Sequence, residues 1–347
     1  MFNNQFAERI ARSGIILSFK RGHIKKIRKE MTKHPKPRKM GSIKRQKIEQ
    51  ELSKLLKLGI ISIKEKGFIY PNHIFILTSE HRSTKDRLIF DMSKLNKSIN
   101  SRKFSMTKIS EILPQLYENE FACSFDIKKA YYHVPINNKY KKYFSFSFNN
   151  IKYTFNSMPF GLNNAPYLFT KFISPILEYL RVHHKIIIFS YLDDFLLLDK
   201  SKTKLAEAIK ISIGLFESLG FLINFDKSQL VPSNQIQFLG INFNLKDKKM
   251  RNSDRLINNI QLQARDLIKK PTISRIELER FIGLGNFMAN YMTNGRHFLH
   301  PIIKITNSYL PYTDRLRKFT NRCDLKEILK HWFAKQFFIH KLKGQKN

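Results

Sequence analysis

Two adjacent carboxylates interrupt a long apolar run in the middle of the chain. Residues 186–198 are mostly aliphatic or aromatic, and Asp193 and Asp194 follow Tyr191-Leu192 within them. Charged side chains rarely lie between apolar strands unless something compensates their charge. A hairpin turn that exposes both aspartates to water is one explanation, and a bound divalent metal ion is the other. The run predicts two strands joined at the aspartates, and this segment alone leaves both explanations open.

A third aspartate favours the metal explanation. Asp126 directly follows the short apolar segment Phe121–Phe125, which is typical of a buried strand. Proteins usually hold Mg²⁺ with a few carboxylates together with phosphate oxygens and water. In two-metal sites the ions lie about 3.5–4 Å apart and stabilise both the attacking and the leaving oxygen of a displacement. We therefore expect Asp126, Asp193 and Asp194 to act together as metal ligands.

The charge of the chain indicates a polyanionic partner. Its 347 residues include 63 Lys and Arg against 27 Asp and Glu, a formal net charge of +36. Nucleic acid is the usual partner of so basic a protein, although an AT-rich genome would also enrich lysine. The two cysteines, Cys123 and Cys323, exclude a disulfide framework and a cysteine-based zinc site. Without a transmembrane stretch or a secretory signal, we expect a cytoplasmic or nuclear protein with no membrane partner.

Helix and strand patterns alternate irregularly, which favours an α+β fold with a largely antiparallel sheet. Asn149-Asn150 predicts a hairpin turn between two strands. Pro175 predicts a kink or break in the helix expected over residues 164–182. The segments Phe221–Asn224 and Gln237–Phe243 are each expected to form one strand. Further helices are expected over 43–58, 107–117 and 203–219, with Gly59 ending the first and Gly220 the last.

Six motifs follow one another along the chain: Arg87-Leu88-Ile89-Phe90-Asp91 with Leu95-Asn96-Lys97, Phe125–Pro135, Met158–Leu162 with Ala165-Pro166, Tyr191–Asp194, Gly220–Lys227 and Phe238-Leu239-Gly240. Their order resembles that of the reverse transcriptase family, and the resemblance spans about residues 45–305. The resemblance implies a right-hand polymerase with fingers, an antiparallel palm sheet and a helical thumb. It implies an RNA-directed DNA polymerase that extends a primer 3′-hydroxyl with dNTPs on an RNA or DNA template.

The resemblance assigns catalytic roles to four residues. Asp126, Asp193 and Asp194 would hold two Mg²⁺ ions, for which Mn²⁺ can substitute. Lys227 would donate a proton to the leaving pyrophosphate, with a solvated or phosphate-facing lysine as the alternative. A catalytically inactive or domesticated copy that only binds nucleic acid is the alternative for the whole chain. An RNA-dependent RNA polymerase is a further alternative, which Tyr131 and the motif around Asp193 disfavour.

The resemblance also assigns residues to the substrates. Arg87 would contact the triphosphate, with Arg82 or Lys85 as a second cation. Tyr131 would exclude a 2′-hydroxyl and so select deoxynucleotides. Phe160 and Gly161 would lie against the nucleotide and the template. The residues implied for the primer grip are Phe238, Leu239 and Gly240, for which an ordinary apolar strand is the alternative.

The subtype and the segments follow from the same resemblance. Leu192 and the start of the motif at Pro159 favour the long-terminal-repeat and pararetroviral side, and residues 279–299 resemble the thumb of DIRS-type retroelements, which use a tyrosine recombinase. Gypsy-type elements come second. We expect a basic extension (1–40), fingers and palm (41–240), a thumb (241–310) and a basic C-terminal segment with a truncated connection (311–347). The chain is then a fragment, a truncated copy, or a polymerase with a separate ribonuclease H or recombinase partner.

Overall fold

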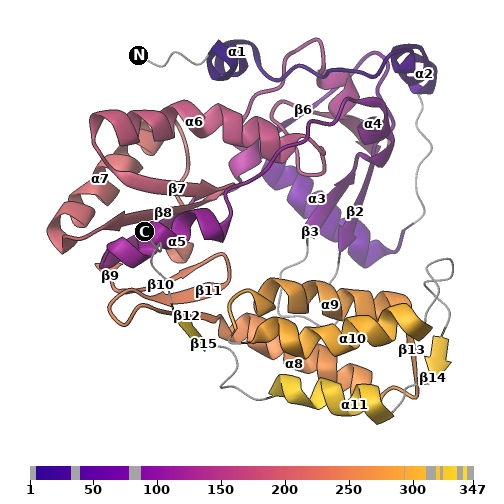
Figure 1. Cartoon of the computed structure of the whole chain (residues 1–347). Coiled ribbons are helices and arrows are strands. Elements are labelled where there is room, and N and C mark those ends of the chain that lie inside the picture. Colours follow the sequence, from indigo (N-terminus) through magenta and orange to yellow (C-terminus); the bar gives the residue numbers. More distant parts are fainter. Residues whose placement is uncertain are drawn as a thin grey trace. The chain divides into compact units, whose positions relative to one another are not determined.

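The computed structural model describes residues 5–32, 40–77, 87–292, 294–309, 318–320, 323–333 and 339–341. The chain divides into two units, each made of three segments. Figure 1 labels the helices and strands along the chain. Unit 1 contains residues 1–106, 126–195 and 211–226, and unit 2 contains residues 107–125, 196–210 and 227–347. These units do not coincide with the four segments expected from the sequence. The four segments stay predictions.

Unit 1 holds the N-terminal helices and three small groups of strands. Its elements are α1 (Gln5–Ser13), α2 (His23–Glu30), α3 (Ser42–Lys57), β1 (Ile61–Ile63), β2 (His73–Leu77), β3 (Arg87–Asp91), α4 (Ser93–Ser98), η1 (Ala130–His133), η2 (Lys141–Phe144), β5 (Ser145–Phe148), β6 (Ile151–Phe155), α6 (Ala165–His183) and β7 (Ile187–Tyr191). Four elements have residues in both units: β4 (Phe121–Asp126), β8 (Asp194–Asp199), α7 (Lys202–Ser218) and η3 (Phe225–Lys227).

Phenylalanine rings form the core of unit 1. One sheet has the strand order β1-β6-β5, and β2 pairs with β3 in a second sheet; all three pairings are antiparallel. The ring centroid of Phe90 on β3 lies 5.3 Å from that of Phe146 and 4.5 Å from that of Phe155. All three rings are buried, so edge-to-face contacts hold the two sheets together.

The turn between β5 and β6 confirms the predicted hairpin. Asn149 has φ 49° and Asn150 has φ 62°, so both lie in the left-handed region. Two successive left-handed residues form a type I′ turn, whose twist matches that of the flanking strands. Asparagine tolerates this conformation better than most residues, which explains why the sequence signal was reliable here.

A four-stranded sheet with the order β7-β8-β4-β9 carries the aspartates of the sequence motifs. β9 (Gln229–Ser233) pairs antiparallel with β4. Phe195–Leu198 of β8 are all buried, with at most 1% of each residue exposed. The apolar run noted in the sequence is therefore a pair of strands, and the charged residues lie where the first strand turns into the second.

Residues 5–32, which we call the N-terminal strap, belong to unit 1 and pack against the rest of it. The backbone forms isolated bridges from Ile15 to Ile136, from Phe19 to Ile99 and from Thr32 to Ile69. The side chains of Ile10, Ile15, Leu17 and Ile27 are buried. The strap is thus part of the core of unit 1. Its basic residues on α2, among them Lys25, Lys26 and Lys29, form an exposed helix face.

Unit 2 combines a small sheet with a helical bundle, drawn in orange and yellow in Figure 1. Its remaining elements are α5 (Ile109–Glu118), β10 (Gln235–Phe238), β11 (Ile241–Asn244), β12 (Lys249–Asn252), α8 (Asp254–Lys269), β13 (Thr272–Ser274), α9 (Arg275–Ala289), α10 (Gly295–Tyr309), β14 (Lys318–Thr320), α11 (Cys323–Lys330), η4 (His331–Phe333) and β15 (Ile339–Lys341). Ile260, Leu278, Phe281 and Trp332 are among the buried residues of the bundle.

Two expectations for local structure were wrong. Gln237–Phe243 forms two strands, β10 and β11, because Leu239 (φ 50°) and Gly240 (φ 80°) turn the chain between them. Phe221–Asn224 forms no strand and makes only the single bridge from Ile223 to Ile127. The expectation for Pro175 is tested only in part: the helix α6 continues through the proline without a break, with buried residues on both sides of it, and a kink there stays a prediction.

The mixture of helices with small antiparallel sheets confirms the α+β class. Among the described residues, no helix has both the length and the apolar character that crossing a membrane requires.

Candidate active site

The turn between β7 and β8 presents two of the predicted carboxylates. Leu192 and Asp193 form the loop, and Leu192 has φ 56°. A left-handed residue at the first loop position is typical of two-residue hairpins, although leucine adopts it at some cost in strain. Asp193 and Asp194 follow directly and are partly exposed. The backbone therefore forms the hairpin turn that was one explanation of the two aspartates. This turn leaves both carboxylates accessible to a ligand.

Asp126 lies next to this turn. It ends β4 and is only 7% exposed. The backbone N–H of Ile127 donates a hydrogen bond of 3.0 Å to the carbonyl oxygen of Asp193. The two aspartates predicted from distant parts of the sequence thus leave the backbone at neighbouring points of unit 1.

Asn224 is a site residue that the sequence reasoning missed. Its side-chain Nδ2 donates to Oδ1 of Asp126 at 2.7 Å, and its backbone N–H donates to the carbonyl oxygen of Asp126 at 2.8 Å. The backbone N–H of Lys128 donates to the carbonyl oxygen of Leu222 at 2.7 Å in the same place. An asparagine after a short apolar segment carries no distinctive sequence signal, so only the folded chain reveals this contact.

Tyr131 lies close enough to Asp193 to feel its charge, and its predicted role at the nucleotide sugar stays a prediction. It belongs to η1, is 9% exposed, and its ring centroid lies 4.8 Å from that of Phe160. Burial, together with the nearby Asp193 carboxylate and Tyr191, raises the pKa of Tyr131 to about 12. The phenol therefore stays protonated at neutral pH, next to a carboxylate. Phe160 is 46% exposed and offers a free ring face.

Gly161 is required for a close contact within the protein. It has φ 101°, and a Cβ at this position would lie 2.6 Å from the carbonyl oxygen of Phe90. Nδ2 of Asn96 donates to the carbonyl oxygen of Gly161 at 2.8 Å, and Oδ1 of Asn96 accepts from the N–H of Asn163 at 3.1 Å. The glycine thus lets the loop that carries Phe160 dock against β3 and α4. Its predicted contact with a nucleotide stays a prediction.

The predicted phosphate contacts fall at the edge of the described chain. The backbone of Arg87, the first residue of β3, pairs with Leu77, and its side chain lies outside the described residues. Arg82 and Lys85 lie wholly outside them.

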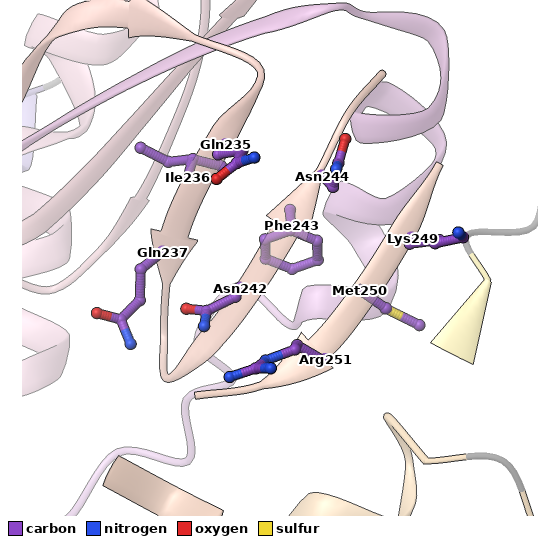
Figure 2. Close-up of a pocket in the computed structure, with 9 residues that line it drawn as sticks. All are labelled: Gln235, Ile236, Gln237, Asn242, Phe243, Asn244, Lys249, Met250 and Arg251. Atoms are coloured by element: carbon purple, nitrogen blue, oxygen red, sulfur yellow. The ribbon is translucent and has the colours of Figure 1, made fainter. Parts of the chain in front are cut away.

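The remaining predicted residues lie in unit 2. Lys227 is exposed at the end of η3. Phe238 is buried, while Leu239 and Gly240 form the turn between β10 and β11. A cavity of about 500 Å³ lies against this sheet. Figure 2 shows the residues of three strands that line it, which include the polar Gln237, Asn242 and Arg251 and the apolar Ile236, Phe243 and Met250. Phe238 is thus a core residue, and the turn is the accessible part of the predicted primer grip.

The three aspartates have the right chemistry for a hard divalent cation, which prefers carboxylate oxygens. However, no group of three or more His, Cys, Asp and Glu side chains in the described part of the chain is gathered closely enough to hold a metal ion. Carboxylates repel one another until a cation compensates their charge. The donor set therefore fits a divalent metal, whereas the side chains do not form a closed ligand cage.

Comparison with known proteins identifies the segment that carries this site. Residues 75–243 match the family profile of reverse transcriptase (RNA-dependent DNA polymerase). The chain is 28% identical over 254 residues to Protein P of a duck hepatitis B virus, covering 69% of this chain and 31% of the viral protein. It is 27% identical over 264 residues to a putative enzymatic polyprotein of cassava vein mosaic virus, covering 74% of this chain and 38% of that protein. The chain thus spans about a third of the length of these relatives.

Solved structures support the fold. The foamy viral protease-reverse transcriptase in complex with RNA/DNA hybrid matches 91% of this chain with a TM-score of 0.72 at 17% identity, covering 40% of that chain. The same protein in complex with dsDNA matches 91% of this chain with a TM-score of 0.70, covering 62% of that chain. These matches confirm the right-hand polymerase fold predicted from the motifs. Reverse transcriptases generally use divalent metal ions, which agrees with the chemistry of the donor set.

Proposed function

We propose that the chain is an RNA-directed DNA polymerase, on the premise that residues 75–243 are a reverse transcriptase domain like those of pararetroviruses and retroelements. The observation that carries the proposal is the hydrogen bond between Ile127 and Asp193, which brings Asp126 to the aspartate turn. The proposed reaction joins a primer 3′-hydroxyl to the α-phosphate of a deoxynucleoside triphosphate, with pyrophosphate as the leaving group.

Asp126, Asp193 and Asp194 are the proposed ligands of two Mg²⁺ ions, which Mn²⁺ can replace. Such ions stabilise the charge that develops on the attacking and leaving oxygens. Asn224 holds the Asp126 carboxyl in place, and we place the nucleotide sugar beside the protonated Tyr131, which lies near Asp193. Lys227 is the proposed proton donor to pyrophosphate.

The other proposed contacts position the substrates. Arg87 would bind the triphosphate, because a guanidinium matches phosphate oxygens in a fork geometry. Phe160 would lie against the nucleotide with its exposed ring, and Gly161 would hold the loop in place. Leu239 and Gly240, at the turn after Phe238, would position the primer end.

Tyr131→Ala is expected to raise the incorporation of ribonucleotides relative to deoxynucleotides, because it removes the ring from the sugar side of the site.

Primer extension tests the proposal. The substrate is poly(rA)/oligo(dT) with dTTP and either Mg²⁺ or Mn²⁺, and the variants are Asp193→Asn and Asp194→Asn. Asp254→Asn is the matched control, because this exposed aspartate lies on α8 in unit 2. We expect wild type and control to extend the primer, and both site variants to lose activity. Wild-type protein that binds the template–primer without extending it would favour the inactive, nucleic-acid-binding alternative.

We further propose a DIRS-type origin, supported by the sequence of α9 and α10, with gypsy-type elements second. A ribonuclease H or recombinase from the same element is then the proposed partner, and the cytoplasm or nucleus the proposed location. A tyrosine recombinase gene beside this one in the source genome would support the DIRS-type origin, and an integrase gene of the gypsy type would contradict it.

A further inference from the structure

A small cavity in unit 1 lies between the N-terminal strap and the start of α6, away from the aspartates. Its volume is about 180 Å³. Ile10, Ile15 and Leu17 of the strap give it apolar walls. The groups that give the cavity its chemistry are Phe6, Arg9, Asn100, Arg102, Asn164 and Tyr167. We call this cavity the strap pocket.

Two arginines stand over aromatic rings of the strap pocket. The guanidinium of Arg9 lies 5.3 Å from the ring centroid of Phe6, and that of Arg102 lies 5.9 Å from the ring centroid of Tyr167. The two rings meet edge-on, with centroids 6.1 Å apart. Neither guanidinium forms an ion pair with a carboxylate in the described part of the chain. The pocket therefore presents two positive charges, each on a planar guanidinium that lies over an aromatic ring.

Asparagine contacts fix the frame of the pocket. Nδ2 of Asn164 donates to the carbonyl oxygen of Asn100 at 2.8 Å, and the N–H of Arg102 donates to Oδ1 of Asn164 at 3.2 Å. Nδ2 of Asn100 donates to the hydroxyl of Ser18 at 2.9 Å, which ties the strap to the same frame. A pocket with fixed walls loses little conformational entropy when it binds a ligand.

We propose that the strap pocket binds an unpaired nucleotide of single-stranded nucleic acid, namely the template ahead of the copied position. Aromatic rings and guanidiniums together bind single strands, because rings stack on bases while cations hold the phosphates. The apolar walls favour a base over a free phosphate ion, which would gain nothing from them. Naming this strand the template rests on the proposed polymerase function.

The position of the pocket agrees with a template contact. Asn164 of the pocket lies four residues after Phe160, which contacts Tyr131 beside Asp193. The hydrogen bond from Asn96 to the carbonyl oxygen of Gly161 joins the same loop to the segment that leads to Asn100 and Arg102. One loop therefore contributes residues to both the aspartate site and the strap pocket, which agrees with one strand reaching both.

The test measures the affinity of the full chain for two template–primers by fluorescence anisotropy. One has a template overhang of a single nucleotide, and the other has a long overhang. Arg9→Ala with Arg102→Ala removes the two pocket charges. Arg12→Ala with Arg21→Ala is the matched control, because it removes the same charge from exposed strap residues that do not line the pocket. The affinities are measured over a range of salt concentrations, with thermal unfolding as a check on folding.

We expect the pocket variant to bind the long overhang about tenfold more weakly, and the short overhang as wild type does. Its slope of log affinity against log salt should fall by about 1.4, as expected for two lost phosphate contacts on a single strand. Arg9→Lys with Arg102→Lys should keep the salt slope and lose part of the affinity, because it keeps charge but not planar stacking.

Two outcomes would overturn the inference. The first is an equal loss in the pocket and control variants, which would mean general electrostatic attraction. The second is a loss that does not depend on overhang length. A protein that shows the overhang-dependent loss but never extends a primer would retain the strap pocket as a single-strand site, while the proposed polymerase function would fail.

Discussion

At the scale of single residues, the site depends on side chains that orient its aspartates through hydrogen bonds. Asn224 contacts Asp126 through both its amide nitrogens, one in the side chain and one in the backbone. Asp126 is buried, so its carboxyl has little water to orient it. A neighbour that orients a metal ligand typically changes metal affinity or activity by about 10–100-fold when it is removed. Asn224 is therefore a positioning residue for the proposed metal ligand.

Asn224→Ala is expected to lower the rate of primer extension by about 10–100-fold and to raise the Mg²⁺ concentration needed for half-maximal activity. The reason is that the Asp126 carboxyl loses its side-chain donor while the fold keeps its packing. Initial rates over a Mg²⁺ series measure both effects, and anisotropy should show unchanged template–primer affinity. Asn258→Ala, on the exposed face of α8, is the control. Wild-type Mg²⁺ dependence in the Asn224 variant would contradict the positioning role.

Gly161→Ala is expected to destabilise the protein by about 1–3 kcal/mol, because the added methyl group meets the carbonyl oxygen of Phe90 and φ is 101°. Gly214→Ala is the matched control. Gly214 lies inside α7, is exposed, and would bring its Cβ within 4 Å of nothing. That substitution should leave stability unchanged or raise it by up to about 1 kcal/mol. Urea denaturation measures both, and equal midpoints for the two variants would refute the close approach at Gly161.

At the scale of elements, the sequence predicted structure wherever a local signal coincided with local geometry. Asn149-Asn150 predicted the β5–β6 turn, and the apolar segment before Asp126 predicted β4. The signal failed at one local turn and at contacts between distant segments. Gln237–Phe243 has the composition of one strand, and the left-handed residues that divide it are a leucine and a glycine. The hydrogen bond from Asn96 to Gly161 joins residues 65 positions apart, and no local sequence pattern predicts it.

The start of α9 provides a prediction about pH. Ser274 and Glu277 form a capping box, and Lys270 also donates to Glu277. Burial opposes ionisation of Glu277, but hydrogen bonds from Lys270 and Ser274 outweigh it and lower the pKa to about 2. The folded state thus favours the carboxylate. This stabilisation is complete above the usual pKa of 4.5 and is lost as pH falls towards 2.

Glu277→Gln should therefore lower the stability of the helical bundle by about 1–2 kcal/mol at pH 7 and have a smaller effect near pH 2. Thermal unfolding followed by circular dichroism between pH 2 and pH 7 measures the difference. Glu327→Gln is the control, since its pair with Lys330 is exposed and contributes little. A constant difference between wild type and Glu277→Gln over this range would contradict the depressed pKa.

At the scale of the whole molecule, the N-terminal strap shows what composition conceals. The sequence indicates a basic extension, because lysines and arginines dominate residues 1–40. In the structure, the few aliphatic residues between those charges decide the placement, and Ile15 and Ile27 are at most 1% exposed. The hydroxyl of Tyr70, itself buried, donates to Glu30 of α2 at 2.8 Å. The number of charged residues indicates that a segment has an exposed face. It does not show whether the apolar residues between the charges form a buried face.

Deletion of residues 1–32 is therefore expected to destabilise unit 1 severely. Full burial of one large aliphatic side chain contributes about 1.5–3 kcal/mol, and the strap buries Ile10, Ile15, Leu17 and Ile27. The combined loss is comparable to the total stability of an ordinary domain, about 5–15 kcal/mol. The matched variant replaces Lys25, Lys26 and Lys29 with Gln, which removes charge and leaves the buried residues in place. Thermal unfolding should show a large fall for the deletion and a shift of only a few degrees for the lysine variant. A deletion variant that unfolds at the wild-type temperature would show that the strap is a separate basic arm and that the strap pocket has no fixed wall on that side.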